Sequence, residues 1–281
     1  MKFSIDTKFT TESIDVGEFA QRVEELGFES LWVPEHPVIP AYPSVGPGGV
    51  VGALIPEGMS QNVDQFTALT VAATATSTLR LGTGVCLVPE HHPIDLAKRI
   101  ATLDLYSNGR FSLGVGAGWS PEESAAMGGN FARRWAQTRE AIHAMKALWT
   151  EDEPEFHGEF YDFPPLLFNP KPIQKPYPPI LLGGSSKNVF NRIATWADGW
   201  YSTNVTPEEV EAGRIEMDRL YVENDRDPAT IDITLFRASP EPEAVKAFQA
   251  VGVDRFTFAV DSYVDSDPFT RLEEVAHMVG L

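Results

Sequence analysis

The chain is poor in cysteine and in positive charge, and it contains no long apolar run. Cys86 is its single cysteine, so no internal disulfide can form, which fits a reducing compartment. The N-terminal residues MKFSIDTKFT hold no apolar stretch of signal-peptide length, and no segment approaches the ~20 apolar residues of a membrane span. We therefore expect a cytoplasmic protein without a membrane partner.

Acidic residues strongly outnumber basic ones. The 40 Asp and Glu against 22 Lys and Arg give a formal net charge of −18 at pH 7. A surface of this sign repels nucleic-acid phosphates over a long range. We expect no nucleic-acid partner, and an anionic cofactor would need local donors to overcome the global field.

Strand-like and helix-like segments alternate along the 281 residues. In the first helical pattern, Val16, Phe19, Val23 and Leu26 fall on one face. Strict alternation predicts parallel strands joined by helical crossovers, and eight units in this length fit one closed (β/α)₈ barrel domain over residues 1–281. A doubly wound open α/β sheet is the alternative. The expected strands are 3–6, 30–34, 79–88, 110–116, 179–182, 199–202, 231–236 and 255–260.

Helix starts are well marked. Ser120-Pro121-Glu122-Glu123 and Thr206-Pro207-Glu208-Glu209 each have the pattern of a capping box with proline at the first helical position. In Asp267-Pro268 a capping residue again precedes a proline, but the sequence does not complete a capping box. We expect a helix to begin at each of these places.

Two long segments interrupt the alternation. Residues 37–60 follow the second strand and are dense in proline and glycine, so they should lie at the C-terminal face of the barrel, where active sites occur. Residues 151–178 precede the fifth strand and are rich in proline and aromatic residues. We expect this second insertion to pack as a strap.

Glycine-rich segments lie at the ends of two expected strands and inside a third. Gly183-Gly184-Ser185-Ser186 opens a helix, a place that suits a phosphate, although a tight turn with a serine cap explains it equally well. Residues 114–119, GVGAGW, lack the last glycine of the dinucleotide fingerprint and indicate either a ligand against the backbone or close packing. Gly82 and Gly84 flank Thr83 inside a strand, which indicates a bulge, a flat ligand or a barrel layer of small side chains.

Histidines stand at the ends of two expected strands. Glu35-His36 ends the second strand, where a histidine can move a proton near neutral pH. In His91-His92-Pro93, adjacent side chains point to opposite sides, so the pair should not bind one metal, and we expect His92 to face the site. The usual ligands of a binuclear metal barrel are also missing from the first strand, and we expect no metal.

The sequence resembles the luciferase-like monooxygenase superfamily over nearly its whole length. The segments that carry the resemblance are SLWVPEH, LRLGTGVCLVPEHHPIDLAKRIATLDLYSNGRFSLGVGAGW and PPILLGGSSKNVFNRIATWADGWY. Its nearest branch is that of the coenzyme F420-dependent oxidoreductases. The resemblance implies a (β/α)₈ barrel that binds FMN or the deazaflavin F420 at its C-terminal face.

The resemblance also implies roles for particular residues. His36, with Glu35 before it, would be catalytic, and some members have a non-prolyl cis peptide near the ring at the third strand. Trp119 stands where deazaflavin-dependent sugar-phosphate dehydrogenases carry an acid, so it would shape a different substrate pocket. The residues implied to bind the cofactor are Thr83, Gly84, Val85, His92, Gly116, Gly118, Gly183, Gly184 and Ser185.

These features predict hydride transfer between F420 and a small organic substrate, with His36 handling the accompanying proton. One alternative is an FMN-dependent monooxygenase that uses O₂ and a partner reductase. A second is a non-catalytic flavin-binding barrel, and a third is a metal-dependent barrel hydrolase. Relatives of this kind often form homodimers, which the sequence neither requires nor excludes.

Overall fold

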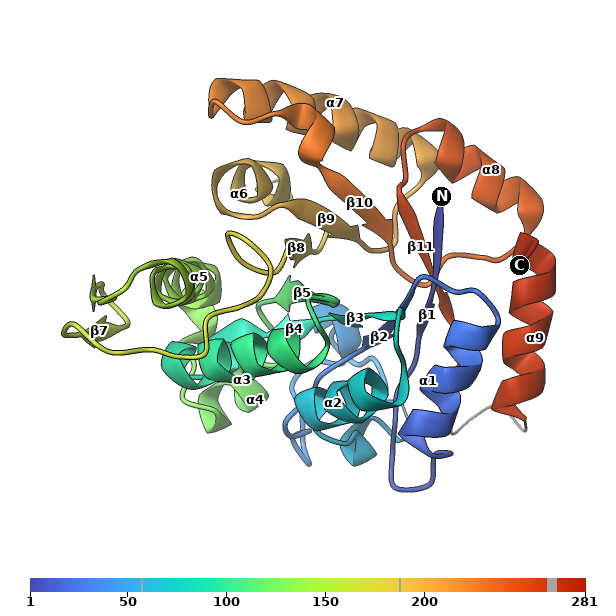
Figure 1. Cartoon of the computed structure of the whole chain (residues 1–281), viewed down its shortest axis with the longest axis horizontal. Coiled ribbons are helices and arrows are strands. Elements are labelled where there is room, and N and C mark those ends of the chain that lie inside the picture. Colours follow the sequence, from blue (N-terminus) through green and yellow to red (C-terminus); the bar gives the residue numbers. More distant parts are fainter. Residues whose placement is uncertain (57, 187, 262–266) are drawn as a thin grey trace.

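The computed structural model describes residues 1–56, 58–186, 188–261 and 267–281. Within them, eight parallel strands close into a barrel, and the pairing of β3 with β5 completes the ring (Figure 1). The barrel is therefore of the expected (β/α)₈ type. Its strands are β1 (Lys2–Asp6), β2 (Ser30–Val33), β3 (Arg80–Thr83), β5 (Phe111–Gly116), β8 (Ile180–Gly183), β9 (Gly199–Ser202), β10 (Asp232–Leu235) and β11 (Arg255–Ala259).

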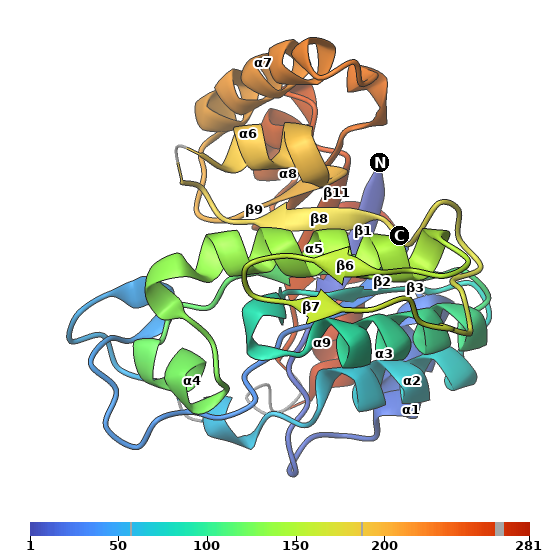
Figure 2. The same ribbon diagram turned by 90° about the vertical axis from the view of Figure 1, so that its left-hand side faces the viewer.

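Helices surround this barrel on its outside (Figures 1 and 2). In α1, buried Phe19 and Val23 lie on the face toward the barrel, and Asp15 caps the first turn. In the described part of the chain, no helix combines the length and apolar character needed to cross a membrane. The helices are α1 (Val16–Glu25), α2 (Gln65–Ala75), α3 (Pro93–Tyr106), α4 (Pro121–Ala126), α5 (Arg134–Thr150), α6 (Val189–Trp196), α7 (Pro207–Glu223), α8 (Pro242–Ala250) and α9 (Pro268–Val279).

The expected strand 79–88 is interrupted by a bulge. It divides into β3 and the short β4 (Cys86–Leu87), and both pair with β5. Gly82 pairs with Ser112 and Cys86 with Val115, so four steps along one strand match three along the other. The Gly84–Val85 peptide inside the bulge is cis, as the family resemblance implied. Thr83 donates its hydroxyl hydrogen to the Gly114 carbonyl at 2.8 Å and ties the two strands together.

Two long segments join elements of the barrel. Residues 34–64 join β2 to α2 and contain two short 3₁₀ turns, Pro47–Gly49 and Met59–Gln61. Residues 151–179 join α5 to β8 and form the small antiparallel hairpin of β6 (Phe156–His157) and β7 (Asp162–Phe163), which lies beside α5 in Figure 2. The first insertion reaches the C-terminal ends of the strands and the second covers the outer helices.

The N-terminal end of the barrel is closed by a network of charged side chains. Arg255 is almost fully buried, and its guanidinium donates to Glu29 Oε2 at 3.0 Å and to Asp232 Oδ1 at 2.8 Å. Arg80 also approaches Glu29, at 3.8 Å. These groups compensate one another, so this end contributes to structure, and the opposite end remains available for a ligand.

Candidate functional site

A cavity of about 630 Å³ opens at the C-terminal ends of the strands. Its volume lies within the range of about 300–1,000 Å³ that small-molecule sites occupy. The 34–64 insertion closes one side through Pro47, Val50 and Met59. Strand-end residues form the floor and walls, namely Asp6, Glu35, His36, Gly84, Val85, Gly116, Trp119, Gly183, Gly184, Tyr201, Phe236 and Arg237.

Glycines keep the floor of this cavity clear of side chains. A Cβ atom at Gly116 would lie 2.5 Å from Val85 Cγ2, and one at Gly84 would lie 2.7 Å from the Tyr201 hydroxyl. Gly184 has φ +110°, a conformation that favours glycine, and open space on its Cβ side. Gly84 and Gly116 thus let Tyr201 and Val85 pack closely beside the cavity, and Gly184 leaves open space at the end of β8.

Two buried polar atoms beside Gly84 lack a partner among the described residues. They are Asp6 Oδ2 and the Tyr201 hydroxyl, and both residues line the cavity. Burial raises the pKa of Asp6 to about 6, although Arg237, whose Nε is 2.7 Å from Asp6 Oδ1, opposes this. Burial also raises the pKa of Tyr201 well above its usual value. Buried polar groups are nearly always hydrogen-bonded, so these two suit the polar atoms of a ligand.

His36 is held between Glu123 and Trp119. Its Nδ1 lies 3.0 Å from Glu123 Oε2, and Trp119 Nε1 donates to His36 Nε2 at 3.3 Å. Because an indole nitrogen only donates, we assign the acceptor role to Nε2 and the proton to Nδ1, which donates to the carboxylate. The fully buried Glu123 therefore fixes the tautomer that leaves a basic nitrogen on the cavity side.

Glu123 is a site residue that the sequence pattern did not reveal. At α7, Thr206 and Glu209 form the complete capping box that their spacing predicts. At α4, the Ser120 hydroxyl accepts from the Glu123 backbone at 3.2 Å, but the Glu123 carboxylate turns inward to His36. The capping box at α4 therefore lacks the bond from the Glu123 side chain to the N-cap backbone, because this carboxylate bonds to His36 instead.

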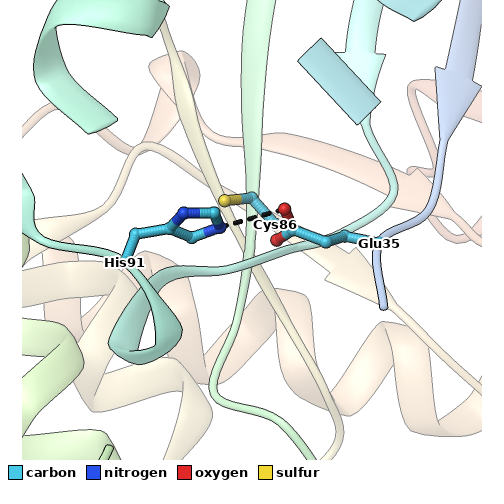
Figure 3. A group of neighbouring side chains, drawn as sticks. All are labelled: Glu35, Cys86 and His91. Carbon is cyan, nitrogen blue, oxygen red and sulfur yellow. Dashed lines mark hydrogen bonds and ion pairs between the residues drawn. The ribbon is translucent and has the colours of Figure 1, made fainter. Parts of the chain in front are cut away.

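Glu35 holds the backbone next to the bulge. One carboxylate oxygen accepts from the Leu87 backbone nitrogen at 2.7 Å, and the other lies 2.9 Å from His91 Nε2. Cys86 points toward the same carboxylate (Figure 3), and atoms of metal-ligand type on the three residues lie within 4.8 Å of one another. Burial raises the pKa of the Cys86 thiol well above its usual value, which disfavours the thiolate that a metal binds. We interpret the cluster as a hydrogen-bonded support for the bulge.

Glu90 is a buried acid between two other acids. It is 3% exposed, and neither of its carboxyl oxygens has a partner among the described residues. Burial, with the charges of Glu123 and Glu35, raises its pKa to about 8. Glu90 therefore keeps its proton at neutral pH.

Some predicted cofactor residues lie away from the cavity. His92 is exposed and caps α3, with Nδ1 accepting from the Ile94 backbone at 3.4 Å, so the expectation that it faces the site is wrong in orientation. His91 is the ring that turns toward Glu35. Thr83 is buried in the β3–β5 contact, and Gly118 lies in an adjoining hollow with Arg134. The remaining predicted cofactor residues, Gly84, Val85, Gly116, Gly183 and Gly184, line the cavity. Ser185 does not line the cavity and is exposed.

The turn after β8 leads to a cation that the sequence reading did not single out. Gly183 and Gly184 line the cavity, and Ser185 and Ser186 continue toward α6. Arg192 of α6 donates to Ser186 Oγ at 3.3 Å and stacks on Trp135 at 4.3 Å. A glycine turn, hydroxyl groups and a guanidinium thus come together where the resemblance implied a phosphate.

Three relatives indicate the range of chemistry near this sequence. An uncharacterized protein of Mycobacterium tuberculosis is 36% identical over 264 residues, which cover 92% of this chain and 91% of that protein. An F420-dependent glucose-6-phosphate dehydrogenase of Amycolatopsis mediterranei is 32% identical over 68% of this chain and 53% of its own length. An FMNH₂-dependent dimethylsulfone monooxygenase of Pseudomonas putida is 32% identical over 60% of this chain and 42% of its own length.

Solved structures share the fold. An F420-dependent secondary alcohol dehydrogenase, in complex with an F420-acetone adduct, superposes with a TM-score of 0.77 at 17% identity, over 99% of this chain and 98% of that one. The model of the luciferase-like monooxygenase family matches residues 7–240. This match covers more than half of the chain, and the chain belongs to the luciferase-like monooxygenase family.

Proposed function

We propose that this protein transfers a hydride between coenzyme F420 and a small organic substrate. The observation that carries the proposal is the histidine at the cavity wall, fixed in one tautomer by a buried carboxylate. A deazaflavin supplies the hydride chemistry, so the protein has to bind, orient and move a proton. His36 with Glu123 is suited to the proton transfer.

The residues present fit a flavin-like ring. Gly84, Val85 and Gly116 would lie against the ring, because each exposes backbone or a small side chain to the cavity. Gly183 and Gly184, followed by Ser185, would lie against the phosphate, because Gly184 leaves open space on its Cβ side. The unpartnered oxygens of Asp6 and Tyr201 would accept or donate hydrogen bonds to the ligand.

In the oxidative direction His36 would act as the base. A substrate hydroxyl would replace the Trp119 indole as the partner of Nε2 and give its proton to that nitrogen. The Glu123 carboxylate would stabilise the imidazolium that results, as a buried acid does in other histidine pairs. In the reductive direction the same nitrogen returns the proton to a carbonyl oxygen.

The substrate we propose is small and carries a hydroxyl or carbonyl group. The described part of the cavity also contains Val50, Met59 and Phe236, so an apolar substrate body fits there. Trp119 occupies the place of the acid found in sugar-phosphate dehydrogenases, which argues against a sugar phosphate.

An FMN-dependent monooxygenase is the second candidate. It is favoured by the relative named as an FMNH₂-dependent monooxygenase. The two candidates differ in their reaction with O₂, because reduced flavins react with oxygen readily and deazaflavins hardly do.

The test is turnover with a panel of small alcohols and carbonyl compounds, with F420 or FMN in both oxidation states. The proposal predicts substrate-dependent oxidation or reduction of F420 without oxygen uptake. Substrate-dependent oxygen consumption with reduced FMN, and none of the F420-linked reaction, would establish the second candidate instead.

A further inference from the structure

A second pocket, of about 790 Å³, lies outside the barrel. We call it the outer pocket. It is formed by α5, by α6 and by the β6–β7 hairpin of the 151–179 insertion, which Figure 2 shows on the same side of the molecule. Arg139 and His143 come from α5, Asn191 and Arg192 from α6, and Phe156 from the hairpin. Trp135 lines both the outer pocket and the C-terminal cavity, so the two hollows meet at this side chain.

The outer pocket contains two arginines that have no acidic partner in the part of the chain that the structure describes. In this acidic chain most arginines form ion pairs with carboxylates, as Arg219 does with Glu216 and Glu223. Among the described residues, Arg139 and Arg192 form no such pair. Neighbouring Arg134 also has no carboxylate partner in the described part of the chain, which likewise supplies no acceptor for its buried Nε. Unpaired guanidinium groups together in a protein of net charge −18 indicate a missing anion.

The acid within the outer pocket forms no ion pair with either arginine among the described residues. Glu140 lines the pocket, but its Oε1 accepts from the backbone nitrogens of Phe160 at 2.6 Å and Tyr161 at 2.8 Å. Its carboxylate is therefore committed to holding the hairpin against α5. Burial together with the charges of Lys146 and Arg139 lowers the pKa of His143, which is the direction expected in a positive field.

The outer pocket begins where the glycine turn after β8 ends. Gly183 and Gly184 line the C-terminal cavity, and Ser186, two residues farther on, accepts from Arg192. Arg192 also stacks on Trp135, the side chain shared by both hollows. A chain of anionic groups leaving the glycine turn would thus meet Arg192 first and Arg139 beyond it.

We infer that the outer pocket binds the anionic side chain of the deazaflavin, the part that continues past its phosphate with further carboxylates. This inference rests on the proposed function and goes beyond it, because it assigns the specificity for a long acidic tail to Arg139 and Arg192. FMN ends at its phosphate, which would meet Arg192 at the glycine turn and would not extend to Arg139. The inference also gives the 151–179 insertion a role, as one wall of the tail site.

The test compares binding of F420 with binding of its tail-less deazaflavin chromophore by fluorescence titration. The double variant Arg139→Ala/Arg192→Ala should bind F420 more weakly, by about tenfold per arginine. It should bind the tail-less chromophore as the wild type does. Because Arg192 also packs on Trp135, the single variant Arg139→Ala, an exposed position, gives the same comparison without disturbing that contact.

The matched control removes two positive charges far from the pocket, in Arg219→Ala/Arg271→Ala, and should bind both compounds normally. If wild-type protein binds both compounds equally, or if the pocket variants lose affinity for both or for neither, the tail site is refuted while the proposed function stands. If wild-type protein binds neither compound, the proposed function fails and the tail site with it.

Discussion

Glu123 shows how a single side chain can depart from its local sequence pattern for a functional reason. Its position in Ser120-x-x-Glu123 favours a bond to the helix N-cap backbone, yet the carboxylate is fully buried and reaches His36. The cost of burying this charge is offset by the imidazole hydrogen bond. Residues that break a strong local rule in this way are good candidates for functional sites.

Replacing Glu123 by glutamine should lower turnover without weakening cofactor binding. The amide keeps the shape but loses the charge that stabilises an imidazolium, so we expect kcat to fall by about 10²-fold, within the range known for acid–base groups. The measurement is F420-linked turnover beside F420 affinity. Glu122→Gln, at the half-buried neighbouring position, is the control, and equal turnover in the two variants would contradict the role of Glu123.

Glu90 should make the protein less stable as the pH rises. Its pKa is raised from 4.5 to about 8 in the folded chain, so between these values the unfolded chain has released a proton that the native state retains. Unfolding is thereby favoured increasingly from pH 5 to pH 8, by roughly 2–4 kcal/mol in total. Below pH 4.5 both states are protonated and the penalty is absent.

Glu90→Gln removes this penalty, so its gain in stability over the wild type should be much larger at pH 8 than at pH 5. Urea unfolding at the two pH values measures it, with the exposed Glu243→Gln as the control. A difference between variant and wild type that does not change with pH would show that Glu90 is ionised in the folded protein.

At the scale of elements, the bulge between β3 and β4 connects the barrel to the cavity. It displaces the chain by one residue relative to β5 and brings Val85 to the cavity wall opposite Gly116. Thr83 and Glu35 hold its two sides through bonds to Gly114 and Leu87. The position of the ring surface therefore depends on the absence of a side chain at Gly116.

Gly116→Ala should weaken cofactor binding through this element. The new Cβ would lie 2.5 Å from Val85 Cγ2 and push Val85 into the cavity, which costs roughly 1–3 kcal/mol. We expect F420 affinity to fall by about tenfold. The double variant Gly116→Ala/Val85→Ala restores the space and should recover affinity, whereas an unaltered affinity in Gly116→Ala would mean that the ring does not lie here.

The elements were predictable because their signals are local. Apolar runs and capped helix starts identified the eight barrel strands and their helices, and position at strand ends indicated His36, Gly84, Gly116 and Gly183. The partner of His36 was not predictable, because Glu123 lies 87 residues away and only the closed barrel brings the two together. The choice between His91 and His92 failed because the backbone forms a 3₁₀ turn over Val88–Glu90 rather than a continuous strand.

At the scale of the whole molecule, the two ends of the barrel divide stability from function. The N-terminal end holds the compensated network of Arg255, Glu29 and Asp232, and the C-terminal end holds polar groups for which the described residues supply no partner. This is the division expected of barrel enzymes. It predicts that changes at the two ends have separable effects.

Arg255→Leu should destabilise the protein and leave ligand binding intact. Removing the guanidinium leaves Glu29 and Asp232 without their main partner near the barrel interior, which costs about 3 kcal/mol. Urea unfolding should show the loss, while F420 affinity of the folded variant stays at the wild-type value. A large fall in the F420 affinity of the folded variant would contradict the claim that one end of the barrel serves stability and the other serves ligand binding.

The central claim is that the C-terminal cavity binds a deazaflavin in preference to a flavin. Titration of the purified protein with F420 and with FMN, each oxidised and reduced, tests it most directly through fluorescence and absorbance. The account predicts micromolar or tighter binding of F420 and much weaker binding of FMN. Tighter binding of FMN, or binding of neither cofactor, would contradict it.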